Sequence, residues 1–187
     1  MKKKNKIILF SLLAFAIVLF LIIEFAIIPS VKNSRAEYAK NQTDAFTHDI
    51  TVIEDFKSPY MGDASNISNM FYALPLNNIS MKFQLNSEIG ALTVSYLDTV
   101  WNIGEEKVAR DLIYNSVAAM AAIGNLNEIN YEFSGSSYSF SREQIETIFD
   151  MPLSDLLTDK SIWEEKVQSK LNSTAFVEQF YSTTGED

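Results

Sequence analysis

The chain has 187 residues, of which 47% are hydrophobic, a formal net charge of −9 and no cysteine. This length suffices for one compact domain with a hydrophobic core plus an additional segment. The missing cysteine excludes disulfide bonds, thiolate metal sites, catalytic thiols and lipid-modified cysteine.

The N-terminus is a basic cluster followed by an apolar run. Residues 1–6 contain four lysines, and residues 7–28 are interrupted only by Ser11 and Glu24. As a helix, this run of 22 residues would be ~33 Å long, which matches a hydrocarbon core of ~30 Å. Positive flanks stay on the cytoplasmic side. The pattern therefore predicts a cytoplasmic tail over 1–6, a transmembrane helix over 7–28 in the cell membrane, and an extracellular remainder.

A cleaved signal peptide is the alternative, with Ser34-Arg-Ala36 as a tolerable cleavage sequence. The apolar run exceeds the roughly 7 to 15 residues of a usual signal core, so retention as a signal-anchor is favoured. Glu24 lies near the outer end of the span and is interpreted as a carboxylate that reaches the headgroups.

The remainder is acidic. Without the four N-terminal lysines and Glu24, it holds 11 basic and 23 acidic residues, a formal charge of −12. A domain of this charge is repelled by anionic polymers, so nucleic acid is excluded as an expected partner.

The segment after the anchor begins with a polar stretch. Residues 29–43 are read as a stalk or a loose helical continuation, and residues 44–187 as the folded domain. A helix is predicted over 46–57, with a strand at 50–53 as the alternative. The stretch Lys57–Asn66 (KSPYMGDASN) is read as a corner, after which a short helix runs to Leu74 and ends at Pro75.

Alternating apolar and polar residues predict two hairpins, over 81–96 and 129–140. Between them, Asn102 is expected to cap a helix over 105–123, which Gly124 would end in the left-handed conformation. The second half of this helix has no polar face, so it must be buried. Capping boxes at Ser141 and Ser161 predict helices over 142–149 and 161–171. A short helix after Pro152 and a last one over 174–181 complete the chain.

This order predicts an α+β domain. Its sheet is expected to be antiparallel, made of the two hairpins, packed on the long central helix and followed by C-terminal helices.

The residues for common catalytic sites are missing. The only histidine, His48, lies in a polar stretch and is interpreted as solvated; no G-x-S-x-G or S-x-x-K motif occurs. One histidine argues against zinc, and the residues after Asp63 do not continue a calcium loop. Adjacent acids such as Glu54-Asp55, Glu105-Glu106 and Glu164-Glu165 point about 100° apart on a helix. Neither an enzyme nor a cofactor is therefore expected.

A series of residues resembles the bacterial domain of unknown function DUF4825, over about Ser58 to Phe149. The series includes Leu74-Pro75 and the strand Ile129–Phe133, and its candidate motif residues are Tyr60, Gly62, Asp63, Asn66, Tyr96, Tyr114 and Asn115. The resemblance implies an extracytoplasmic domain of Gram-positive bacteria that is tethered by a membrane helix or carried beside regulatory modules. Residues 150–187 form a helical tail beyond it.

Three functions stay open. The leading hypothesis is a binding or sensor-accessory domain that contacts a protein or peptide. The second is a carboxylate-based hydrolase of the cell wall, which would need two acids facing each other across a cleft about 5 to 9 Å wide. The third is a structural subunit of a membrane complex, indicated by an exposed apolar patch that includes Trp101 or Trp163. Both tryptophans are expected in the core.

Overall fold

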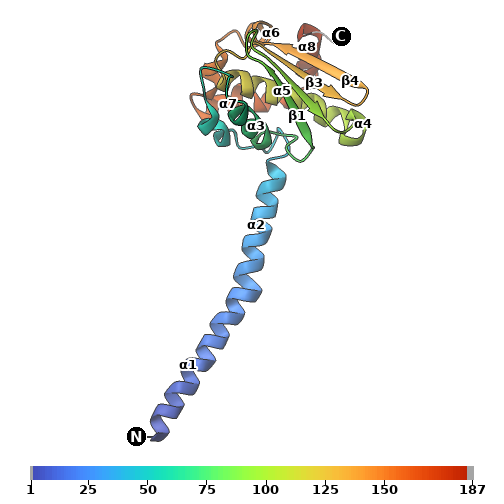
Figure 1. Ribbon diagram of the computed structural model, residues 1–187. Helices are drawn as coiled ribbons and strands as arrows, with labels where there is room; N and C mark the ends of the chain where they lie inside the picture. The colour runs from blue at the N-terminus through green and yellow to red at the C-terminus, as the bar shows by residue number, and fades with distance from the viewer. Residues whose placement is uncertain (1, 185–187) are drawn as a thin grey trace. The chain divides into compact units, whose positions relative to one another are not determined.

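The computed structural model describes residues 2–184 (Figure 1). It contains two compact units, one comprising residues up to 40 and the other beginning at Asn41. Each unit is described by itself.

The N-terminal unit is helical throughout. It comprises α1 (Lys2–Ile22), a π-helical turn η1 (Ile23–Ile27) and most of α2 (Ile28–Asn41). By length and composition, residues 8–41 form a helix able to cross a membrane. The π turn has a local cause: the ring of Pro29 would collide with the carbonyl four residues back, and the wider turn relieves this. Accordingly, the Ile28 amide donates to Ile23 O, five residues back.

The second unit contains a four-stranded sheet in the order β1-β2-β3-β4. The strands are β1 (Met81–Asn86), β2 (Ala91–Tyr96), β3 (Glu128–Phe133) and β4 (Ser136–Ser141). Both predicted hairpins are present and antiparallel. The expectation of a wholly antiparallel sheet is wrong, because β2 and β3 pair in parallel. The long helix between them carries the chain back to the starting end of β2, and such a crossover makes the two strands parallel.

The two faces of the sheet differ in polarity, as the alternation predicts. One face carries buried Leu92, Val94, Ile129 and Tyr131, and the helices cover it. The other face is polar. It carries Thr93 and the two residues that pair with it, Gln84 and Asn130. The α+β class is therefore confirmed.

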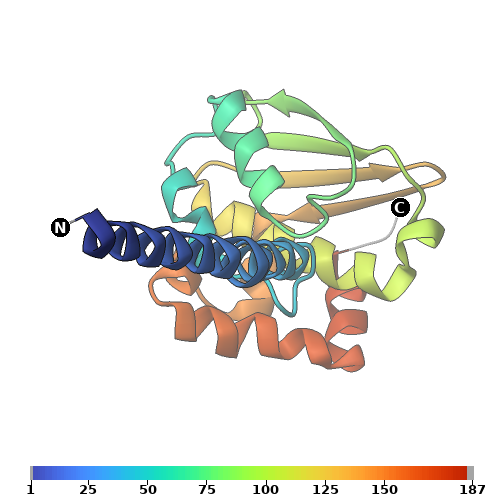
Figure 2. The same ribbon diagram turned by 90° about the horizontal axis from the view of Figure 1, so that it is seen from below.

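The central helix α5 (Glu105–Ala122) lies between the sheet and the C-terminal helices (Figure 2). Every residue from 111 to 122 is buried, as the missing polar face predicts. Its alanines allow close approach of neighbours, and η3 (Leu153–Leu157) and α8 (Thr174–Thr184) both pack on it.

Helix starts were predicted less well than helix positions. Ser141 forms the expected capping box with Gln144 at the start of α6 (Arg142–Phe149). Asn102 is not a cap: it lies inside the short helix α4 (Val100–Ile103), which Thr99 caps, and Gly104 at φ 108° separates α4 from α5. Ser161 is not a cap either, because Asp159 caps α7 (Lys160–Lys166).

The remaining helices frame this core. They are the 3₁₀ helix η2 (Ile50–Phe56), α3 (Ala64–Ala73) and the 3₁₀ helix η4 (Gln168–Asn172). The helix predicted over 46–57 is thus a shorter 3₁₀ helix, whereas the short helix after Pro152 and the last helix are present. At the β1 edge, α3 contacts the sheet through Phe71 and Tyr72, whose rings lie 5.8 and 5.9 Å from that of Phe83.

Candidate functional site

The structure brings four of the motif residues together in the corner between η2 and α3. Asp63 caps α3: its Oδ1 accepts from the amides of Ser65 at 2.9 Å and Asn66 at 3.0 Å. The Asn66 side chain donates to the carbonyl of Phe56 at 2.8 Å. Tyr60 is exposed, and Gly62 has an ordinary φ with open space around it. Asp63 and Asn66 therefore hold the shape of the turn.

This corner is attached to the end of α5. The Ser58 amide donates to Ala122 O and the Gly124 amide to Ser58 O, both at 2.9 Å. The Met61 amide donates to Asn125 Oδ1 at 2.6 Å. Gly124 is not in the predicted left-handed conformation. Its role is close approach, since a Cβ there would lie 3.1 Å from the carbonyl oxygen and 3.2 Å from Cα of Pro59.

We expect Gly124→Ala to lower the free energy of unfolding by about 1–2 kcal/mol, because the corner must move away from α5. Gly62→Ala is the matched control and should change it by less than about 0.5 kcal/mol. Urea unfolding of both variants measures the difference. Equal losses would show that Gly62 has a conformational role that its φ and surroundings do not reveal.

The other three motif residues lie in the core. Tyr96 is 3% exposed and stacks on Phe133 with ring centroids 4.9 Å apart. Asn115 donates through Nδ2 to Pro75 O at 2.8 Å, which joins α5 to the loop after α3. Within the described residues, the Tyr96 hydroxyl and Asn115 Oδ1 are buried without a hydrogen bond of good geometry. Burial raises the pKa of Tyr96 well above its ordinary value, so this side chain stays neutral.

Tyr114 points to a different part of the core from its neighbour Asn115, since adjacent helical residues diverge by about 100°. Its ring meets that of Trp163 edge-on, with centroids 4.9 Å apart. Its hydroxyl lies 2.8 Å from Nδ1 of His48.

The prediction that His48 is solvated is wrong: it is 3% exposed. Its Nε2 lies 2.8 Å from Ala73 O, which can only accept, so Nε2 carries the proton and Nδ1 accepts from Tyr114. Burial lowers the pKa of His48 to about 4. The neutral imidazole therefore serves as a hydrogen-bonded link between α5 and the end of α3.

A second buried polar cluster surrounds Asp111, which is 1% exposed. Its Oδ1 accepts from the amide of Ala45 at 2.8 Å, and its Oδ2 pairs with Nζ of Lys107 at 2.5 Å. Lys107 also donates to Thr43 O and lies 3.3 Å from Oδ2 of Asp44. Burial raises the pKa of Asp111 to about 6 despite the neighbouring ammonium. This cluster fastens the segment before η2 to α5.

The acidic side chains do not assemble into a metal site in the part of the chain that the structure describes, where no suitable group of three His, Asp or Glu residues occurs. Glu54 instead pairs with Lys57 at 2.7 Å. Asp63 caps α3, as described above.

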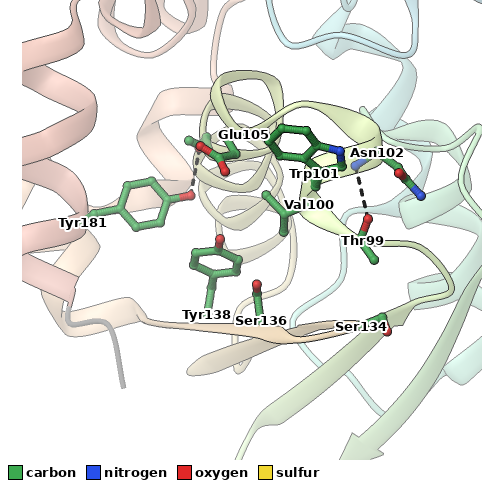
Figure 3. A pocket seen from close by; sticks show the side chains of 10 residues that line it. Thr99, Val100, Trp101, Asn102, Glu105, Ser134, Ser136, Tyr138 and Tyr181 are labelled. Atoms are coloured by element: carbon green, nitrogen blue, oxygen red, sulfur yellow. Dashed lines mark hydrogen bonds between the residues drawn. The ribbon is translucent and has the colours of Figure 1, made fainter.

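An open cavity of about 730 Å³ lies beside exposed Trp101, at one end of the sheet (Figure 3). Its walls come from α4, the first turns of α5, the β3–β4 hairpin and α8. We call it the Trp101 groove. Figure 3 shows Trp101 on one side, Tyr138 and Tyr181 on the other, and Glu105 between them. The Tyr181 hydroxyl donates to Ala109 O at 3.0 Å, which fixes this wall to α5.

Trp101 is 82% exposed, so its expected place in the core is wrong, whereas Trp163 is completely buried as expected. An exposed indole beside hydroxyl, amide and carboxylate groups is a feature of binding surfaces.

Comparison with known protein families matches residues 53–144 to the domain of unknown function DUF4825. Residues 53–144 are a DUF4825 domain. The resemblance recognised in the sequence is thereby confirmed. No curated protein and no solved structure matched the chain.

The DUF4825 domain includes the whole sheet, α5 and all seven motif residues. It also includes the walls of the Trp101 groove except Tyr181. His48 and Trp163 lie outside it, so their contacts with Tyr114 join the DUF4825 domain to the segments that flank it.

Sequence reasoning missed three features of this region, and weak signals existed for two. Asp111 follows Lys107 by four residues among apolar neighbours, which is the spacing of a helical ion pair that faces the core. Trp101 has Asp98 three residues before it and Glu105 four residues after it, a polar surrounding that favours exposure. No local signal marks His48 as buried.

Proposed function

We propose that this protein is a single-pass, membrane-anchored binding or sensor-accessory protein, whose DUF4825 domain lies outside the cell membrane and contacts a protein or peptide. The Trp101 groove is the observation that carries the proposal. It combines an open concave surface, an almost fully exposed tryptophan and several hydrogen-bonding side chains on rigid elements. Such surfaces are typical of recognition.

The buried polar residues support binding over catalysis. His48 is neutral and hydrogen-bonded on both nitrogens, and Asp111 is paired with Lys107. Both join segments of the fold, and neither His48 nor Asp111 lines the groove. The chain is therefore proposed not to be an enzyme.

The orientation can be tested with single cysteines, because the chain has none of its own. We expect Ser87→Cys, in the exposed β1–β2 turn, to react with a membrane-impermeant maleimide on intact cells. Asn5→Cys, beside the lysines, should react only after lysis. The opposite pattern would place the DUF4825 domain in the cytoplasm, and label on a shortened product in the medium would show cleavage.

The hydrolase alternative is tested separately by incubating the purified full-length protein with peptidoglycan, ester and peptide substrates. No turnover is expected. Turnover that is lost on substitution of Asp63 or Glu54 would establish the cell-wall hydrolase alternative. The structural-subunit alternative would be favoured if the protein is recovered only in a stable complex through the surface around Trp101 and Leu97, which are both exposed.

A further inference from the structure

We propose that the Trp101 groove binds an extended, basic segment of a partner protein, with a lysine or arginine side chain held between the indole of Trp101 and the carboxylate of Glu105. This inference rests on the proposed function and specifies the chemistry of the partner and the residues that receive it.

The position of Glu105 favours a cationic ligand. Within the described part of the chain, its carboxylate has no ion pair, although basic side chains are near. Lys107 is committed to Asp111 and Asp44. Arg110 lies 4.8 Å above the ring of Phe46 and 3.4 Å from Oε2 of Glu106. A cation from outside would supply the partner that the chain itself does not give to Glu105.

The shape of the surface favours an extended ligand. Two further hollows, of about 490 and 500 Å³, adjoin the groove. All three are lined by Glu105, and Trp101 lines the groove and one of the others. Glu105 is therefore the point where three depressions meet, which suits an extended chain better than a compact ligand.

The groove also combines an aromatic face with negative charge. The segment 98–106 carries Asp98, Glu105 and Glu106. Lys107 and Arg110, which line the adjoining hollow, are paired with Asp111 and Glu106. A cation over an indole and beside a carboxylate is attracted by both the ring quadrupole and the charge. The acidic charge of the whole domain also steers basic partners toward it and disfavours an anionic lipid surface.

The neighbouring strand offers a way to hold the backbone of such a segment. Ser136 and Tyr138 of the groove belong to β4, which is an edge strand of the sheet. An extended peptide that lies beside this edge, near Ser136, can place one side chain in the groove.

The test uses the full-length protein in phosphatidylcholine nanodiscs and uncharged Gly/Ser/Thr nonapeptides with a central lysine, arginine, norleucine or glutamate. Binding is read as protection of the exposed Trp101 from acrylamide quenching, since buried Trp163 contributes a constant background. We expect the lysine and arginine peptides to bind, with an affinity that falls as salt is raised, and the other two to bind at least about threefold more weakly.

Three variants locate the site. Glu105→Gln should lower the affinity for the basic peptides by about three- to fivefold and reduce the salt dependence of that affinity. Trp101→Leu should lower the affinity for the basic peptides by about two- to fivefold. Because this variant lacks the fluorescent reporter, its peptide binding is measured by the anisotropy of a labelled peptide. Glu88→Gln, the same charge change in the β1–β2 turn at the other end of the sheet, should have no effect. Circular dichroism confirms that each variant is folded.

Equal binding of the norleucine and lysine peptides would overturn the proposal, as would equal effects of Glu105→Gln and Glu88→Gln, or no protection by any peptide. Quenching of Trp101 fluorescence by brominated lipid in the nanodisc would show that the groove contacts the membrane surface. This result would overturn the proposal of a peptide ligand. A photo-crosslinker is placed at Asn102 in one variant and at Ser87 in another, both in native membranes. Comparing the two variants separates the proposed binding role of the protein from the proposed ligand of the Trp101 groove. Partners captured only from Ser87 would sustain the binding role of the protein and reject this groove.

Discussion

Replacing Asp111 by alanine is expected to lower the free energy of unfolding by about 3–5 kcal/mol. The side chain is 1% exposed and accepts from both the Ala45 amide and Lys107. Its removal leaves a buried amide and a half-buried ammonium without their partner, and these groups lose their hydration without compensation. The segment before η2 would then separate from α5.

The matched control is Glu106→Ala, which removes a carboxylate from an ion pair of the same i,i+4 type on the same helix. That pair is at 3.4 Å and the Glu106 side chain is 89% exposed, so the expected loss is below about 0.5 kcal/mol. Urea unfolding of full-length protein in detergent, followed by the fluorescence of Trp163, measures both. Similar losses for the two variants would mean that burial of Asp111 is not what gives the pair its effect.

Acidification is expected to destabilise the domain through His48. Burial lowers the pKa of His48 from 6.5 to about 4 in the folded protein. Between these values the unfolded chain binds a proton that the folded chain does not, so the free energy of unfolding falls as the pH falls. The difference between the two pKa values corresponds to a loss of about 3 kcal/mol in the free energy of unfolding once the pH has reached 4.

Asp111 acts in the opposite sense over nearly the same window. Burial raises its pKa from 3.8 to about 6, so the folded chain takes up a proton before the unfolded chain does, and stability rises as the pH falls from 6 to 3.8. The two contributions oppose each other in the natural protein. Its own pH profile therefore understates both.

The two contributions are separated by variants. The stability difference between the natural protein and His48→Gln should shrink by about 3 kcal/mol between pH 7 and pH 4, because only the natural protein carries the histidine. The free energy of unfolding of Asp111→Asn should fall by about 3 kcal/mol over the same interval, because the opposing contribution of the Asp111 carboxyl is then absent. Unfolding curves at several pH values test this. A difference between the natural protein and His48→Gln that does not change with pH would contradict the buried neutral imidazole.

The candidate site was only partly predictable. The corner residues Asp63 and Asn66 carry a local signal, since a cap and its helix are neighbours in sequence. Trp101 and Glu105 come within reach of Tyr138 and Tyr181 only when the second hairpin and α8 reach the same end of α5. The groove therefore depends on segments that the local sequence cannot place together.

By itself, the sequence determined the features that repeat along the chain. The apolar run predicted a membrane-length helix, alternation predicted both hairpins, and the unbroken apolar half of α5 predicted its burial, because each depends on a period within one segment. Tertiary structure decided the parallel pairing of β2 with β3, the burial of His48 and the exposure of Trp101. These depend on which segments cover a residue, and burial of a single polar or aromatic side chain leaves no period in the sequence.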